Sequence, residues 1–168
     1  MSQHRRAPVF RDVQKLRAYI KDAGAEQVVL SNGCFDPLHV GHIRYLEGAR
    51  QNGDFLIVAL NDDVSTRSVK GSERPVVSEN DRAEILAALK PVDAVLLFSQ
   101  KNVSSLLEAL RPKYHAKGTD YTVDTVPERE TSRRLGIQTV IAGDEKSHAS
   151  SEVLARLREK DKAKGEER

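Results

Sequence analysis

The sequence predicts an α/β fold: a single Rossmann-like, doubly wound domain with a five-stranded parallel sheet and helices on both faces. Two observations support this fold class. Short hydrophobic runs alternate with amphipathic segments of helical period along the 168 residues, which is the pattern of successive βαβ units. The hydrophobic runs also read as strands buried on both faces, as in parallel sheets. Right-handed crossovers between such strands give a doubly wound sheet.

The first part of the chain predicts helix, strand, helix and strand in turn. In both helical segments the apolar residues recur at spacings of three and four, and a glycine, Gly24 or Gly53, marks the expected end. The sequence "NDD" follows the second strand and lies at its carboxyl end. The expected elements are a helix over 11–23, a strand over 27–30, a helix over 40–53 and a strand over 55–60.

The second part continues the alternation. Its first helix begins with Ser78, and Asp81 follows three residues later in a cap-like arrangement. The expected elements are helices over 78–90, 102–111, 127–136 and 150–160, and strands over 93–98, 114–118 and 138–143. We therefore expect one domain over residues 1–157, followed by a charged, frayed tail over residues 158–168.

Composition excludes several classes of function. The net charge is only +2, from 27 Lys and Arg against 25 Asp and Glu, so nothing indicates nucleic-acid binding. Cys34 is the single cysteine, which rules out an intramolecular disulfide and a cysteine-based zinc site. No segment resembles a signal peptide, and the apolar runs are too short to span a bilayer. A cytoplasmic protein without membrane contact is the expectation.

The segment "SNGCFDPLHVGHIR", residues 31–44, carries the chemistry. It joins the first sheet strand to its helix, at the edge where such sheets bind ligands. Gly33 permits close backbone approach, and the helix N-terminus offers N–H groups to a phosphate. His39 and His42 lie three residues apart and share a helix face, while Gly41 adds no side chain there. A two-histidine metal site lacks a third ligand in this segment, so polyphosphate is the better match.

The segment "NGCFDPLHVGHIRYL" resembles the HxGH nucleotidyltransferases of the cytidylyltransferase-like superfamily, and the resemblance runs from Val13 to Leu157. The sequences "NDD", "RPVVSENDRAEILAAL" and "KGTDYT" are most similar to its sugar-phosphate branch. That branch is typified by the D-glycero-D-manno-heptose 1-phosphate adenylyltransferase domain of ADP-heptose synthesis. Glycerol-3-phosphate cytidylyltransferases are a close second.

This resemblance implies an enzyme that transfers a nucleoside monophosphate, AMP from ATP, to a sugar phosphate such as heptose 1-phosphate and releases pyrophosphate. The phosphate nucleophile is already ionised and needs no general base, so positioning and charge neutralisation remain for the protein. Mg²⁺ is expected to bind mainly through the triphosphate. The alternatives are a CTP-dependent cytidylyltransferase, an adenylyltransferase of FMN or phosphopantetheine, and a nucleotide-binding regulatory module.

The resemblance also assigns residues. The catalytic candidates are His39, His42 and Arg44. The nucleotide-binding candidates are Gly33, Cys34, Phe35, Asp36, Gly41, Lys117, Gly118, Asp120, Ser150 and Ser151. Candidates for contacts to substrate or phosphate are Asp62, Asp63, Arg74, Arg82, Lys146 and His148.

Plainer roles stay open for some of these residues. Asp36 and the two aspartates after the second strand suit helix or loop caps. Arg44 suits a solvated helix position, and Arg74 and Arg82 suit surface salt bridges. Cys34 suits a small filler residue more than a nucleophile.

Two positions depart from the family pattern. Ala149 stands where the family usually has the first hydroxyl of its last phosphate turn, and Thr119 stands where the heptose branch often has glycine. These departures bear on the acceptor more than on the reaction. From the family we also expect a homodimer, and we expect that any sugar kinase of the same pathway is a separate chain.

Overall fold

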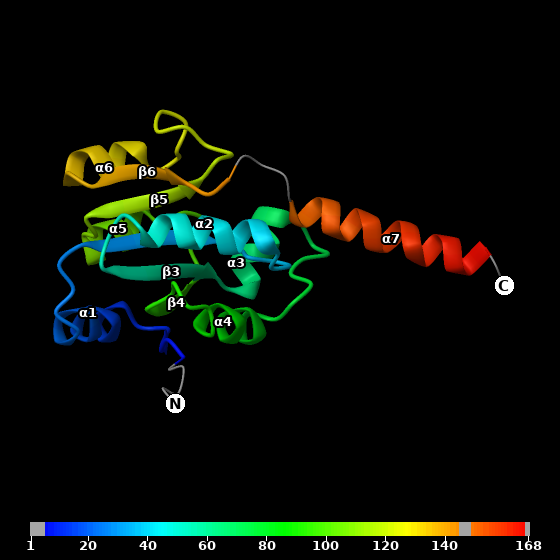
Figure 1. The fold of residues 1–168 in the computed structure, drawn as a ribbon, viewed down its shortest axis with the longest axis horizontal. Helices are drawn as coiled ribbons and strands as arrows, with labels where there is room; N and C mark the ends of the chain where they lie inside the picture. Colours follow the sequence, from blue (N-terminus) through cyan, green and yellow to red (C-terminus); the bar gives the residue numbers. More distant parts are fainter. Residues whose placement is uncertain (1–5, 145–148, 167–168) are drawn as a thin grey trace.

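A computed structural model describes residues 6–144 and 149–166, with backbone alone over residues 161–166. Its sheet has six parallel strands in the order β1-β4-β3-β2-β5-β6 (Figure 1). The strands are β1 (Val9–Phe10), β2 (Val28–Gly33), β3 (Phe55–Asn61), β4 (Ala94–Phe98), β5 (Tyr114–Gly118) and β6 (Gln138–Ala142). From β2 the chain adds β3 and β4 on one side and then β5 and β6 on the other, while β1 lies at the outer edge beside β4. The topological switch therefore lies between β2 and β5, where doubly wound sheets open a crevice for ligands.

Helices cover both faces of this sheet. They are α1 (Val13–Asp22), α2 (Val40–Arg50), α3 (Asp63–Lys70), α4 (Glu79–Ala87), α5 (Ser104–Leu110), α6 (Arg129–Leu135) and α7 (Ser150–Glu166). On one face α2 and α4 pack on alternate strand residues such as Val58, and on the other α1 and α5 pack on residues such as Ile57. All seven residues of β3 are buried, as expected for a central parallel strand.

The sequence prediction of fold class is confirmed, but its count of five strands is wrong. The sixth strand, β1, pairs with β4 through Val9–Val95 and Phe10–Leu96. Two residues are too few to produce a periodic signal, and only the neighbouring strand makes them β-structure. Helix α3 is likewise missing from the prediction. Its sequence is mostly polar and buries only Ser65 and Thr66, so it has no apolar stripe.

Helix α7 crosses the predicted end of the domain. It continues from Ser150 to Glu166 through residue 157, and Figure 1 shows it extending away from the sheet. The division into a domain over 1–157 and a tail over 158–168 stays a prediction. No helix in the described part of the chain is long and apolar enough to cross a membrane.

Gly53 lets the turn before β3 pack closely against the chain at Gln27 and Val29. The helix it was expected to end already has its C-cap at Gln51. A Cβ on Gly53 would lie 2.0 Å from the Gln27 carbonyl oxygen and 2.7 Å from Cγ2 of Val29. Both distances are far below contact, so any side chain here must push β2 away from the turn before β3.

We therefore predict that Gly53→Ala lowers the free energy of unfolding by about 2 kcal/mol, the usual cost of overpacking. Urea denaturation measures it. Gly118→Ala is the matched control because a Cβ there meets no atom within 4 Å, and its stability should stay within about 0.5 kcal/mol of the parent. Equal stability of the two variants would contradict the packing argument.

Candidate functional site

A cleft of about 650 Å³ opens at the carboxyl edge of the sheet, around the switch between β2 and β5. It brings together most of the residues that the sequence predicts. Those lining it are Gly33, Cys34, Phe35, Asp36, His39, Gly41, His42, Arg44, Arg74, Lys117, Gly118, Asp120, Ser150 and Ser151. Asp62, Asp63 and Arg82 are not among the lining residues. Lys146 and His148 lie outside the described residues.

The two histidines build the start of α2. His39 is the N-cap residue in extended conformation, and its backbone N–H donates to Nδ1 of His42 at 3.3 Å. The two imidazole rings stack with centroids 3.9 Å apart. The spacing of three residues therefore does two things: it closes the first helical turn, and it places both rings together in the cleft.

The electrostatics of this pair favour a neutral His42. Burial, together with the nearby His39 and Lys70, lowers its pKa to about 4. Because Nδ1 accepts the hydrogen bond from His39, the proton of the neutral ring is assigned to Nε2. At neutral pH His42 is therefore an N–H donor without a formal charge.

The loop before the histidines is held by an aromatic contact. Phe35 has φ of 49°, in the left-handed region that a bulky residue rarely adopts. Its ring lies 5.1 Å from that of His42 and stacks at 6.5 Å on Tyr45. A Cβ on Gly33 would come within 3.1 Å of the Phe35 ring. Glycine at position 33 thus makes room for the ring that supports His42.

Asp36 is a loop anchor. It is buried and accepts hydrogen bonds from Arg74 Nε at 2.7 Å, Val76 N–H at 2.8 Å and Val77 N–H at 2.9 Å. Burial raises the pKa of Asp36, but these hydrogen bonds outweigh it and hold the pKa below its usual value. Of the two roles left open by the sequence, the geometry favours the structural one. Arg74 is neutralised by this pair while still lining the cleft.

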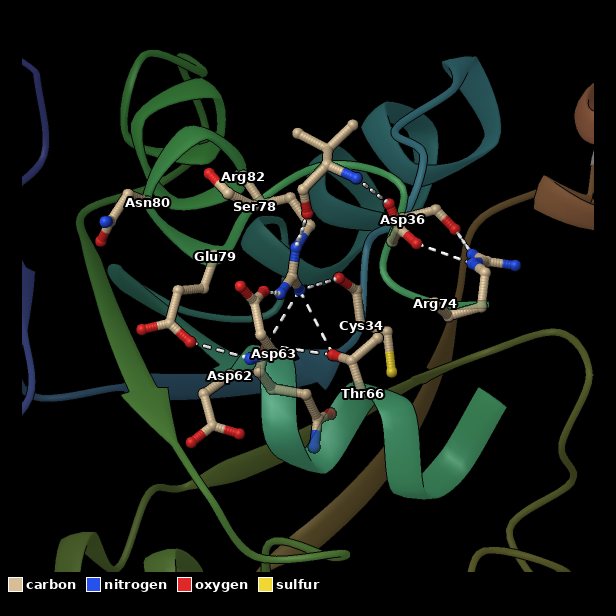
Figure 2. A network of polar contacts seen from close by, with 12 residues as sticks. Cys34, Asp36, Asp62, Asp63, Thr66, Arg74, Ser78, Glu79, Asn80 and Arg82 are labelled. Atoms are coloured by element: carbon tan, nitrogen blue, oxygen red, sulfur yellow. Dashed lines mark hydrogen bonds and ion pairs between the residues drawn. The ribbon is translucent and has the colours of Figure 1, made fainter. Parts of the chain in front are cut away.

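Arg82 is fully buried and ties three segments together (Figure 2). Its Nε donates to the Val77 carbonyl at 2.8 Å, and Nη1 donates to the carbonyls of Cys34 at 2.6 Å and Asn61 at 2.9 Å. Its Nη2 pairs with Asp63 at 2.7 Å. The expectation of a phosphate clamp or a surface salt bridge at Arg82 is therefore corrected, because its donors are already used inside the protein.

The neighbouring aspartates have structural partners as well. Asp62 is the N-cap of α3 and accepts the Ser65 N–H at 2.7 Å and the hydroxyl of Ser99. Burial raises its pKa, and these hydrogen bonds lower it to below the usual value. The cap role left open by the sequence accounts for Asp62, and the ion pair with Arg82 accounts for Asp63.

The remaining candidates lie on the rim. Arg44 pairs with Asp144 at 2.9 Å, with both side chains about half exposed. The hydroxyl of Ser150 donates to the Pro37 carbonyl at 3.1 Å and so ties the start of α7 to the loop before α2. Thr119, one of the two departures from the family pattern, donates to the Asp144 carbonyl at 2.7 Å.

Sequence reasoning missed several cleft residues: Asn32, Lys70, Lys101, Tyr121 and Glu128. Lys70 ends the unpredicted helix α3, which explains why it went unnoticed. Asn32 is the second-to-last residue of β2, next to the histidine loop. A polar residue at the carboxyl end of a parallel strand indicates a ligand contact, so the sequence could have identified it. Nothing local in the sequence distinguishes Glu128 from its exposed neighbours.

Comparisons with known proteins agree with this geometry. The model of the cytidylyltransferase-like family matches residues 30–159. "Bifunctional protein HldE" of Methylobacillus flagellatus is 43% identical over 132 residues, which are 79% of this chain and 27% of the relative. The protein of the same name from Koribacter versatilis is 50% identical over 111 residues, which are 66% of this chain and 23% of the relative. The chain thus spans less than a third of either relative.

Solved structures show the same fold. A lipopolysaccharide core biosynthesis protein from Thermoplasma volcanium aligns with a TM-score of 0.60 and 25% identity, covering 71% of this chain and 98% of that one. Pantothenate synthetase from Thermus thermophilus aligns with a TM-score of 0.55 and 19% identity, covering 82% and 61%. The second similarity concerns the fold alone.

We predict that His42 titrates near pH 4 in the free protein, well below the usual value of 6.5. Between these values the unfolded chain binds the extra proton, so His42 makes stability fall as the pH drops from about 6.5 to about 4. Residue-resolved NMR titration of the imidazole measures the pKa directly. Lys70→Met should raise it, and a value near 6.5 in the parent would refute the burial argument.

A second prediction concerns Arg82. Arg82→Met should lower the free energy of unfolding by about 3 kcal/mol, because it leaves buried carbonyl groups and Asp63 without their donor. Chemical denaturation gives the value. Arg67→Met, an exposed position on α3, is the control and should stay within about 0.5 kcal/mol. A loss at Arg82 no larger than at Arg67 would mean that the network adds nothing to stability.

Proposed function

This chain belongs to the cytidylyltransferase-like family and is a nucleotidyltransferase, and from that premise we propose that it transfers AMP from ATP to a sugar 1-phosphate such as heptose 1-phosphate. One observation carries the proposal: the stacked pair of His39 and His42 at the N-terminus of α2, facing a cleft with several cationic side chains. The similarity to proteins named HldE supports the sugar-phosphate branch. We take the acceptor from that branch.

The reaction needs no general base from the protein. An acceptor phosphate oxygen attacks the α-phosphorus of the triphosphate, a new P–O bond forms, and the bond to the bridging oxygen breaks with its electron pair leaving on pyrophosphate. The neutral N–H of His42 and the N–H groups at the start of α2 donate to oxygens on which charge grows. Lys70 lines the same cleft and adds positive charge, while Arg44 lines it paired with Asp144.

The family generally uses a divalent metal ion, and we propose that Mg²⁺ binds here mainly through the triphosphate. Among residues 6–144 and 149–160, whose side chains the structure describes, no three His, Cys, Asp or Glu gather as a metal site. The cleft carries the carboxylates of Asp120 and Asp144 near its rim, so few protein ligands are at hand. When bound, the ion neutralises charge on the phosphates. We also propose a homodimer, as the family resemblance implies, and a cytoplasmic location.

A pyrophosphate-release screen tests the proposed reaction. ATP and CTP are each combined with heptose 1-phosphate, other sugar 1-phosphates, glycerol 3-phosphate and FMN. We expect release only when ATP and a sugar 1-phosphate are both present. Release with CTP and glycerol 3-phosphate, or with FMN, would replace the proposed substrates. Release without any acceptor would indicate hydrolysis, and no release with any pair would favour a binding module.

The histidine pair gives the matching prediction. His39→Ala and His42→Ala should each lower kcat by about 10²- to 10³-fold, since each removes a donor to transition-state charge. Glu47→Ala, an exposed position on the same helix, serves as the control and should retain activity. Circular dichroism confirms the fold of all three variants. Unchanged turnover in both histidine variants would remove them from the reaction.

A further inference from the structure

A buried ion pair forms part of the wall of the cleft. Lys117, from β5, and Glu128, just before α6, are only 6% and 3% exposed. The ammonium nitrogen lies 3.8 Å from Oε2 of the carboxylate and 4.6 Å above the ring of Tyr121. Both residues line the cleft. Burial lowers the pKa of Lys117, and the carboxylate of Glu128 opposes that shift.

Asn32 completes this wall in a fixed orientation. Its Oδ1 accepts from Nε2 of His115 at 3.1 Å and from Lys117 Nζ at 3.4 Å. Burial and the nearby Lys117 together lower the pKa of His115 to about 3, so the ring is neutral. Because Nε2 faces Oδ1, the proton is assigned to Nε2. With Oδ1 held by two donors, the NH₂ group of Asn32 is the part offered to the cleft. His115 thus acts as a positioning residue.

Glu128 has an acceptor that no group in the described protein satisfies. Its Oε2 is buried without a hydrogen-bond donor, and Lys117 is too far away to bond to it. Its Oε1 accepts only one long hydrogen bond, 3.5 Å from the Val103 N–H. A buried carboxylate left in this state costs stability, and a ligand hydroxyl that donated to Oε2 would remove the cost.

We propose that Asn32, Lys117 and Glu128 bind the ring hydroxyls of the acceptor, which makes the acceptor a polyhydroxylated sugar phosphate. This inference rests on the proposed function. Hydroxyls both donate and accept, which matches one carboxylate acceptor beside two N–H donors. The ion pair of Lys117 and Glu128 has no net charge, so it does not attract a phosphate group. The acceptor phosphate has cations elsewhere in the cleft, with Lys101 after β4 one of them.

The test is steady-state kinetics of Glu128→Gln, a substitution of nearly equal size. The probe is heptose 1-phosphate, or whichever sugar 1-phosphate the pyrophosphate screen selects. The KM for the sugar 1-phosphate should rise about 10-fold or more, while the KM for ATP stays within about twofold. Glu130→Gln, exposed in the first turn of α6, is the matched control and should change neither constant.

A second measurement keeps the test independent of folding defects in the variant. The parent enzyme should lose about 10-fold or more in kcat/KM with one deoxy analogue of the sugar 1-phosphate. With that analogue Glu128→Gln should lose little more, because both changes delete the same hydrogen bond.

The assignment would be overturned if every deoxy analogue lowered kcat/KM by the same factor and Glu128→Gln lost as much with each of them as the parent does. A rise confined to the KM for ATP would overturn it too, because it would mean that these residues bind the ribose of the nucleotide. Failure of every sugar 1-phosphate to release pyrophosphate would instead defeat the proposed function. The two ideas can therefore fail separately.

Discussion

The buried guanidinium of Arg82 is the interaction on which the cleft depends. It joins the loop after β2, the end of β3 and the segment before α4, through Cys34, Asn61 and Val77. These segments are far apart in sequence and meet only at the carboxyl edge of the sheet. A planar group with five donors can serve three carbonyl groups and the Asp63 carboxylate at once, whereas an ammonium on a flexible stem cannot. The position of the backbone before the histidines follows from this arrangement.

A second buried pair extends the same principle. Asp36 and Arg74 fix the far end of the loop, and two backbone N–H groups complete the coordination of the carboxylate. These two ion pairs, Arg82 with Asp63 and Arg74 with Asp36, therefore serve the architecture of the loop. In the proposed function, phosphate binding falls to cleft side chains such as Lys70 and Lys101 and to the neutral imidazole of His42. The rigid loop lets these groups meet a ligand without rearrangement.

The sequence predicts the fold where hydrophobic periodicity is strong, and it predicts the histidine loop because local spacing alone places two rings on one helix face. It misses β1 because only pairing with β4 makes those two residues regular. It misses α3 because that helix is mostly polar and has no apolar stripe. It could not separate Arg74 from Arg82, since their partners lie tens of residues away. For the same reason Glu128 went unnoticed: its burial depends on Lys117 of another strand.

For the proposed sugar 1-phosphate acceptor, the arrangement of charge in the cleft also implies a direction of binding. Cationic side chains and N–H groups gather where phosphates must meet, whereas the wall of Lys117 and Glu128 is neutral as a pair. A sugar 1-phosphate has one anionic end and one end rich in hydroxyls. Its phosphate is drawn towards the histidines and its ring towards the neutral wall, because the reverse placement would put a dianion beside a buried carboxylate. An in-line attack on the α-phosphorus requires the acceptor phosphate to be held in one orientation, and contacts at both ends of the acceptor provide this.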